Sequence, residues 1–330
     1  MRYLTAADIK KVFSMRQAIE ADREALSLYS AGRADIPLRT NIDVPEHNGQ
    51  SLYMPGYVSS SQPALGIKIV SVYPDNPQKD LPSVPATMIT LDATTGVVNA
   101  VLDGTYLTQL RTGAIQGLAT ELLSRSNSSQ ALLIGTGGQA MSQLLAMLTV
   151  RPLKKIYIYD LDQKRATDFA QQAAKKFSRQ FAAEFLPIAD PDQVVAQVDI
   201  ITTVTTSHRA TFDGQLVKSG THINGIGAYT PDMCEMPTEV LQKADCIIFD
   251  TMDGVLAEAG DIIQPVEKRQ LSKNNFTGEL GQLINKKILG RTSQNQITVF
   301  KTVGTAAVDV VAADRIVKAA QQAKVGTILN

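Results

Sequence analysis

The sequence is poor in the residues on which several classes of protein depend. It has no tryptophan, only two cysteines and only three histidines among 330 residues. The cysteines form no CxxC pair, and no HxxxH or HExxH spacing occurs, so a zinc site and a disulfide framework are both disfavoured. We therefore expect no metal, and we interpret Cys234 and Cys246 as core or turn thiols.

An excess of one charge and a long hydrophobic run are also missing. Lys plus Arg and Asp plus Glu both total 32, and no basic run suited to tracking phosphates occurs. No apolar run is long enough to span a bilayer, and Asp8, Lys10 and Lys11 interrupt the segment where a signal peptide would be apolar. We expect a cytoplasmic protein that binds neither nucleic acid nor a membrane.

The N-terminal third combines a helix with short strands. Residues 5–32 have apolar residues at helical spacing, and Thr5 with Asp8 resembles a capping box. Turn residues then separate short strands, which predicts a mostly antiparallel sheet followed by a helix over 106–123. We expect the strands at 51–58, 65–73, 86–92 and 96–103.

From residue 131 to about residue 300, short apolar strands alternate with helical segments. Strands and helices that alternate at this interval form parallel βαβ units. The sequence therefore predicts an α/β fold with a Rossmann-type, doubly wound parallel sheet, and one further amphipathic helix from Thr305. We expect the parallel strands at 131–135, 155–160, 183–188, 198–204, 221–226 and 246–250, with a seventh at 297–300.

The first of these strands leads into a glycine-rich turn, IGTGGQA, that precedes a helix. Gly135 allows the tight turn, Gly137 lets the backbone approach a pyrophosphate, and Ala140 lets the helix pack closely on the strand. The N–H groups at the helix N-terminus would bind the phosphates. Asp160 ends the next strand, about twenty residues further on, where an acidic side chain accepts hydrogen bonds from ribose hydroxyls.

This pattern predicts a nicotinamide dinucleotide, and the alternative is a glycine turn followed by a solvated aspartate. An acidic side chain at position 160 would repel a 2′-phosphate, so NAD(H) is favoured. NADP(H) stays open as a cofactor because Lys164 and Arg165 are close in the sequence.

Three cations lie in apolar or turn-like surroundings, namely Arg39 after IPL, Lys68 within LGIKIV and Arg111 at the start of RTGA. Burying an unpaired charge in so apolar a strand is costly, although strand alternation could instead place Lys68 on a solvated face. A guanidinium pair suits a carboxylate, and a desolvated lysine can donate a proton.

Together these features resemble the ornithine cyclodeaminase/μ-crystallin family. That family includes ornithine and lysine cyclodeaminases, an archaeal-type alanine dehydrogenase, and ketimine and Δ1-pyrroline-2-carboxylate reductases. The matching stretches follow the family's order over nearly the whole chain. They are PLR (37–39), GIK (66–68), LPS (81–83), RTGA (111–114), IGTGGQA (134–140), THINGIGA (221–228), EAGD (258–261) and TVGTAAVDV (302–310).

The resemblance implies a homodimer and two domains. Residues 1–115 would form an α+β domain for substrate binding and dimerisation, completed by a C-terminal helix over 305–330. Residues 116–304 would form the NAD(P)-binding Rossmann domain.

The resemblance also implies roles by position. Arg39, Lys68 and Arg111 would hold the substrate's carboxylate and nitrogen-bearing centre, with Lys68 catalytic, and Tyr229 and Val303 would lie beside the substrate. The residues that would line the dinucleotide are Ser83, Arg111, Thr112, Gly135, Gly137, Gly138, Gln139, Asp160, Thr203, Thr205, Ile226, Gly227 and Thr302.

The sequence departs from the cyclodeaminase pattern at Tyr229. Cyclodeaminases and the archaeal alanine dehydrogenase have an aspartate there that serves as general acid and base. A carboxyl of pKa about 4 to 6 can take and return protons during deamination, whereas a tyrosine of pKa ~10 stays protonated at neutral pH. Reducing a preformed imine needs only one weak donor, such as Lys68 or a water, so the pattern GAYTPDMxE favours the Δ1-pyrroline-2-carboxylate reductase branch.

The predicted function is reduction of a cyclic 2-carboxylated imine by NAD(P)H, giving L-proline or L-pipecolate. One alternative is ornithine cyclodeaminase or a related amino-acid dehydrogenase, with Asp232 or Glu235 replacing the missing acid, although both fit ordinary turn or helix-cap roles. Another is a dinucleotide-binding protein without turnover. We also expect the acids of EAGD to cap the next helix and His222 to be a hydrogen-bonded core histidine.

Overall fold

The computed structural model describes residues 1–329, and the chain divides into two compact units. Unit 1 comprises residues 1–114 together with the segment from Thr305 onward, and unit 2 comprises residues 115–304. Each unit is described by itself. The boundary between them falls within helix α3 (Gly104–Leu123).

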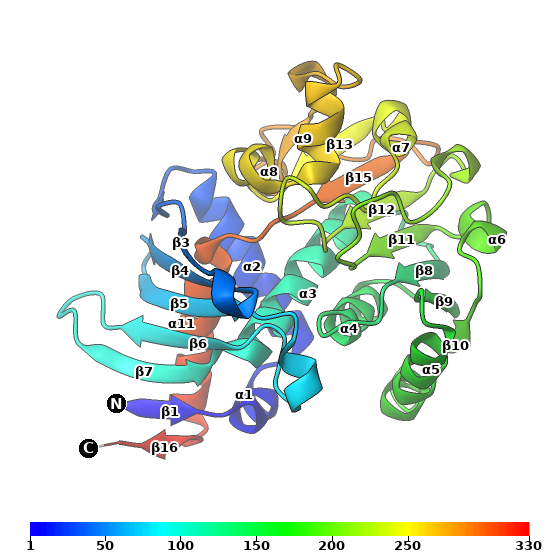
Figure 1. Cartoon of the computed structure of the whole chain (residues 1–330). Coiled ribbons are helices and arrows are strands. Elements are labelled where there is room, and N and C mark those ends of the chain that lie inside the picture. The colour runs from blue at the N-terminus through cyan, green and yellow to red at the C-terminus, as the bar shows by residue number, and fades with distance from the viewer. Residues whose placement is uncertain (330) are drawn as a thin grey trace. The chain divides into compact units, whose positions relative to one another are not determined.

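Unit 1 contains an eight-stranded sheet of order β16-β1-β7-β6-β5-β4-β2, with β3 also paired to β4 (Figure 1). Only β1 and β7 pair in parallel, so the prediction of a mostly antiparallel sheet is confirmed. The sequence did not predict the short strands β1, β2, β3 and β16. The bounds are β1 Arg2–Leu4, β2 Ala34–Asp35, β3 Thr40–Val44, β4 Gly49–Val58, β5 Ala64–Val72, β6 Ala86–Leu91, β7 Val98–Asp103 and β16 Thr327–Ile328.

The single helix predicted over residues 5–32 is wrong, because the chain forms α1 (Ala6–Val12) and α2 (Met15–Tyr29) there. Phe13 is extended, and the Ser14 side chain caps α2 in a capping box with Gln17. A side-chain cap of this kind lets a new helix begin at once, and the apolar periodicity continues across the break. The predicted Thr5–Asp8 capping box of α1 is present.

Helix α11 (Ala306–Gln322) fills the core of unit 1. It packs against α2 and against strands β4 and β5, and all residues from Ala306 to Ala313 are buried. We predicted an amphipathic helix, but its first two turns are buried on every side. The short 3-10 helices η1 (Pro45–His47) and η2 (Asn76–Lys79) lie in loops of the same unit.

Unit 2 contains an all-parallel sheet of order β10-β9-β8-β11-β12-β15-β13-β14, which confirms the predicted Rossmann-type fold. The seven predicted strands are all present within one or two residues, whereas β14 was not predicted. The bounds are β8 Gln130–Ile134, β9 Lys155–Tyr159, β10 Glu184–Pro187, β11 Ile200–Thr203, β12 His222–Gly225, β13 Cys246–Phe249, β14 Gly278–Glu279 and β15 Thr298–Lys301.

Helices flank this sheet along its length. In Figure 1, α4 and α5 lie beside the half with β8 to β10, and α7, α8 and α9 lie beside the half with β12 to β15. Because helices cover a parallel sheet on both faces, its strands are largely buried, and every residue of β11 and β15 is buried. The helices are α4 Ala140–Val150, α5 Gln163–Phe177, α6 Asp192–Val195, α7 Thr238–Lys243, α8 Met252–Glu258, α9 Gly260–Glu267 and α10 Leu280–Ile284, with η3 Gly214–Leu216 and η4 Lys273–Asn275.

The strand order reverses direction at the centre of the sheet. The chain runs outward from β8 through β9 to β10, then returns to place β11 on the other side of β8. Doubly wound sheets bind ligands at such a switch point, beyond the carboxyl ends of the strands. Within the described residues, no helix has both the length and the apolar character needed to cross a bilayer.

The buried helix α11 gives a test of the unit 1 core. Ile316 is fully buried in it, and Ile316→Ala should lower the free energy of unfolding by about 2–5 kcal/mol because it removes buried methyl groups and leaves a cavity. Urea denaturation measures the change. Gln321→Ala, at an exposed position of the same helix, should change it by less than about 0.5 kcal/mol. Equal effects of the two substitutions would contradict the core position of α11.

Candidate functional site

The loop between β8 and α4 is shaped for a glycine at its first position. Gly135 has φ +100°, and a Cβ there would lie 2.7 Å from the carbonyl oxygen of Val204. A side chain is therefore excluded both by backbone conformation and by the next strand of the sheet.

Packing within unit 2 does not explain the next two glycines of the loop, Gly137 and Gly138. A Cβ added to Gly137 or Gly138 would meet no described heavy atom within 4 Å, and neither residue has a positive φ. Packing within unit 2 therefore does not require them, whereas close approach of a ligand to the backbone would. Helix α4 begins directly after this loop, and its N-cap residue, Gln139, makes no capping hydrogen bond. This open, glycine-lined helix N-terminus fits a pyrophosphate.

Asp160 follows β9 and holds the glycine loop. One of its oxygens accepts hydrogen bonds from the backbone N–H of Thr136 at 3.0 Å and from its hydroxyl at 2.5 Å. The other accepts from the N–H of Asp162 at 3.1 Å. Burial opposes ionisation, but these hydrogen bonds and the nearby Arg165 lower the pKa of Asp160. An ionised carboxylate thus stands beside the loop, as ribose recognition requires.

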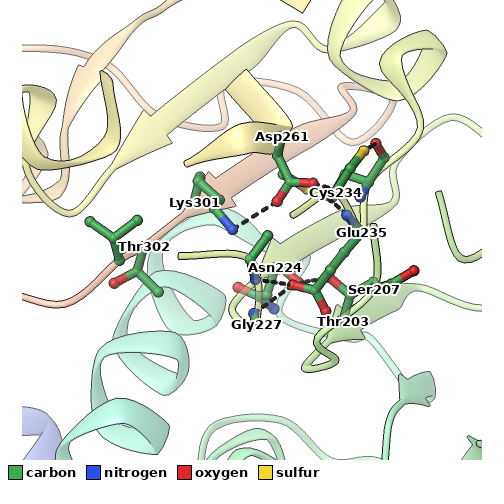
Figure 2. Close-up of polar contacts among 12 residues, drawn as sticks. Thr203, Ser207, Asn224, Gly227, Cys234, Glu235, Asp261, Lys301 and Thr302 are labelled. Carbon is green, nitrogen blue, oxygen red and sulfur yellow. Dashed lines mark hydrogen bonds and ion pairs between the residues drawn. The ribbon is translucent and has the colours of Figure 1, made fainter. Parts of the chain in front are cut away.

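Glu235 joins the loops that follow β11 and β12 (Figure 2). Its carboxylate is fully buried and accepts hydrogen bonds from the N–H groups of Thr205 at 2.5 Å, Gly227 at 2.5 Å and Ala228 at 2.7 Å. Thr203 ends β11, and its carbonyl accepts a hydrogen bond from the N–H of Ile226. Glu235 is therefore neither an ordinary turn residue nor a helix cap, because it ties together two loops predicted to line the cofactor.

Asp261 supports Glu235 from α9. Its Oδ1 accepts the N–H of Glu235 at 2.6 Å and the N–H of Met236 at 2.9 Å, and its Oδ2 pairs with Lys301 Nζ at 2.7 Å. Both charged side chains are fully buried, and Figure 2 shows the contact between them. The expectation that EAGD caps the next helix is wrong for Asp261, because α9 has no side-chain cap and the carboxylate bonds to other segments.

A third buried carboxylate orders the segment after β15. Asp250 accepts the hydroxyl of Thr302 at 2.5 Å and the N–H groups of Val303 at 3.1 Å and Gly304 at 2.8 Å. Burial raises the pKa of Asp250. Thr302 and Val303, predicted to lie near the nicotinamide and the substrate, are thus fixed at the same edge of the sheet as Gly227.

In unit 1, two of the predicted cations share one carboxylate. Lys68 Nζ lies 2.7 Å from Oδ2 of Asp309, and Arg111 Nε lies 2.8 Å from Oδ1 of the same side chain. Lys68 is fully buried, so the alternative of a solvated lysine is wrong. Burial, the charge of Arg111 and the charge of Arg39 lower the pKa of Lys68 to about 7, although Asp309 acts in the opposite direction.

A second acid adds little negative charge to this cluster. Asp22 on α2 is fully buried, and within the described residues neither of its carboxyl oxygens has a hydrogen-bond partner. Burial raises the pKa of Asp22 well above its ordinary value, against the attraction of Arg111. Burial therefore disfavours the charged form of Asp22, and Lys68 and Arg111 both face the carboxyl group of Asp309. A lysine and an arginine gathered around one acid suit an anionic substrate.

The remaining predicted residues lie at the periphery of these groups. Arg39 is half-buried, directly before β3, and lies near enough to Lys68 to influence it. Ser83 is half-buried in the bend before β6, and Thr112 follows Arg111 on α3. Tyr229 is half-buried in the turn after β12.

His222 is a hydrogen-bonded core histidine, as predicted. Its ring nitrogens contact Thr298 Oγ1 at 2.9 Å and Asn224 Oδ1 at 3.0 Å, and burial lowers its pKa to about 3. Both cysteines are free, and burial raises the pKa of Cys234 to about 12, so its thiol stays protonated. Neither group is a base or nucleophile at neutral pH.

Sequence reasoning missed the buried acids Asp22, Asp309 and Asp250 and the buried cation Lys301, and it misjudged the role of Asp261. For Asp309 a signal existed, since a single acid in the apolar run TAAVDVVAA requires a buried partner. The stretch ITVFKTV presents Lys301 in the same way. The partners themselves are far away in the sequence and leave no local pattern.

Comparisons with known proteins agree over the whole length of the chain. A Δ1-pyrroline-2-carboxylate reductase from Bacillus cereus is 32% identical over 326 residues, spanning 99% of this chain and 98% of that relative. The structure of Thermococcus litoralis Δ1-pyrroline-2-carboxylate reductase with NADH and L-proline has a TM-score of 0.94 and 36% identity, covering 100% of both chains. An archaeal alanine dehydrogenase dimer with bound NAD has a TM-score of 0.90 and 32% identity, covering 100% of this chain and 99% of that one.

The family model for the ornithine cyclodeaminase/mu-crystallin family matches residues 2–324. That span includes the glycine loop, the buried cations and the segment after β15, so the resemblance inferred from short motifs is confirmed. The chain belongs to the ornithine cyclodeaminase/mu-crystallin family.

Proposed function

We propose that the protein is an NAD(H)-dependent reductase of a cyclic imine that carries a carboxylate on the imine carbon. The observation that carries this proposal is the buried pair of Lys68 and Arg111, which share the carboxyl group of Asp309. Δ1-Pyrroline-2-carboxylate, reduced to L-proline, is the first substrate, and the six-membered Δ1-piperideine-2-carboxylate is the second. The relatives named as Δ1-pyrroline-2-carboxylate reductases support this choice.

The cations of unit 1 have separate tasks in the proposed reaction. Arg111 and Arg39 bind the substrate carboxylate, because a guanidinium suits its planar geometry. Lys68, with a pKa of about 7, is poised to give a proton to the ring nitrogen at neutral pH. Asp309 keeps both Lys68 and Arg111 oriented.

Unit 2 would hold the cofactor. When bound, NADH supplies the hydride that reduces the imine carbon. The glycine loop and Asp160 would bind its pyrophosphate and ribose, and Thr205, Gly227 and Thr302 would line the nicotinamide end. Asp160 favours NADH, and Arg165, 4.0 Å from Asp160, is a residue suited to a 2′-phosphate. The division into a substrate domain and a dinucleotide domain is part of this proposal.

The cyclodeaminase alternative needs an acid in place of the missing aspartate at position 229. Glu235 does not supply one, because both of its oxygens accept backbone N–H groups inside the protein. Asp232 is exposed and bonded to Thr230 of its own turn, and this hydrogen bond lowers its pKa. The reductase therefore fits the site better than a deaminase.

A substrate panel tests the reaction. With NADH the wild-type protein should reduce Δ1-pyrroline-2-carboxylate and release no ammonia from L-ornithine with NAD, because position 229 has a tyrosine in place of the aspartate that serves cyclodeaminases as general acid and base. NADH absorbance and an ammonia assay measure the two reactions. Ammonia release without imine reduction would favour a cyclodeaminase, and binding of NADH without turnover of any imine would favour a binding protein.

The pH profile tests Lys68. If Lys68 donates the proton, kcat/KM should fall as the pH rises through about 7, because the pKa of this lysine is lowered and its charged form is lost there. Lys68→Met should lower kcat/KM by about 10²–10⁴-fold and remove this limb of the profile. The exposed Lys79→Met is the matched control and should behave as wild type. An unchanged profile in Lys68→Met would assign the donor elsewhere.

We also propose that the protein is a cytoplasmic homodimer whose contact lies on the unit 1 sheet. One face of this sheet is covered by α2 and α11, which bury Lys68 and its alternate neighbours. On the other face, Pro55, Ile67, Ile89 and Val101 are neighbours across four strands and remain half-buried. A row of apolar side chains on a flat sheet suits a second copy of the chain, and the archaeal relative is a dimer.

A charge placed in that row should separate the subunits. Ile67→Glu should convert the dimer to a monomer in analytical ultracentrifugation, because the carboxylate would be desolvated without a partner. Leu161→Glu, at an exposed apolar position of unit 2, is the control and should leave the mass unchanged. A dimeric Ile67→Glu variant, or a monomeric wild type, would contradict this contact.

A further inference from the structure

We propose that Glu235 is a positioning residue for the nicotinamide end of the cofactor. Its carboxylate would fix the turn that carries Gly227 and the loop that carries Thr205, and Asp261, paired with Lys301, would hold the backbone of Glu235 in place. This inference rests on the proposed function, because it takes the carboxyl edge of the unit 2 sheet as the cofactor site. It adds a role that sequence reasoning did not assign.

The two loops lie in close contact at Gly227. A Cβ on Gly227 would collide with the backbone nitrogen and oxygen of Thr205. The same two segments are joined by Glu235, which accepts an N–H from each side. Of the contacts at this turn, the Glu235 side chain is therefore the one that a substitution can remove without a change to the backbone.

Other segments hold Glu235 from behind. Asp261 accepts the N–H of Glu235 itself, and Thr211 donates its N–H to the carbonyl of Glu235. Gly260, the first residue of α9, packs so closely against the carbonyls of Pro231 and Met233 that a Cβ would collide with them. Figure 2 shows Asp261, Lys301 and Glu235 converging from α9, β15 and the loop after β12.

The hydrogen bonds that Glu235 accepts should depend on pH. Burial raises the pKa of Glu235 to about 7; the charge of Lys301 acts in the opposite direction, and the charge of Asp261 adds to the rise. The thiol of the adjacent Cys234 stays protonated. Protonation would turn one acceptor oxygen into a donor that faces a backbone N–H. The turn should then loosen as the pH falls through about 7.

A binding experiment on the full-length protein tests the proposal. NADH affinity, followed by fluorescence titration from pH 6 to pH 8.5, should be highest above pH 7 in wild type. Glu235→Gln should bind about tenfold more weakly at pH 8 and lose the pH dependence, because an amide cannot accept from both sides. Asp232→Asn, which changes an exposed acid in the same segment, is the matched control and should follow wild type.

Wild-type affinity and pH dependence in Glu235→Gln would overturn the proposal. A wild type that binds no NADH would overturn it together with the proposed function, whereas NADH binding without imine reduction would overturn the proposed function alone.

Hydrogen exchange on the wild type decides the question if Glu235→Gln does not fold. The N–H groups of Thr205, Gly227 and Ala228 should lose protection together between pH 8 and pH 6, after correction for intrinsic exchange rates. The N–H of Ile226, which bonds to Thr203, should keep its protection. Constant protection of all four groups would overturn the proposal.

Discussion

The pairing of buried charge is the constraint on which this structure depends. Lys68 and Asp309 lie 241 residues apart in the sequence, yet their side chains meet at 2.7 Å in the core of unit 1. Removing Asp309 would leave Lys68 and Arg111 without the acid they share, and breaking a buried pair typically costs about 3–5 kcal/mol. This pairing joins β5, α3 and α11 at one point. Unit 2 contains a similar buried ion pair, formed by Lys301 and Asp261.

The two units use buried carboxylates for different ends. In unit 1, Asp309 pairs with two basic side chains, and burial disfavours the charged form of the neighbouring Asp22, so the basic side chains can also bind an anion. In unit 2, Glu235, Asp250 and Asp160 accept backbone N–H groups of loops at the carboxyl edge of the sheet. The acids of unit 2 therefore fix the geometry of these loops. The proposed division between substrate and cofactor follows from this difference.

Local patterns allowed much of the fold to be predicted. The strands of unit 2 and the IGTGGQA turn could be predicted because the conformation of each depends on residues that are neighbours in the sequence. The break at Phe13 and Ser14 was missed since the helical periodicity continues across a second capping box. The role of Asp261 was misjudged because its first-turn position on α9 resembles a cap, while its partners lie in other segments. Contacts between segments that lie far apart in the sequence leave no local pattern, so they could not be predicted from one sequence.

The path of the chain through the two units bears on biosynthesis. Unit 2 is continuous, whereas unit 1 needs α11, which follows unit 2 in the sequence. On a ribosome the parallel sheet can therefore be complete while Lys68 and Arg111 still lack Asp309. During that interval unit 1 also exposes the apolar surface that α11 will cover. Unit 1, although it begins first, is therefore the second of the two units to be completed during synthesis.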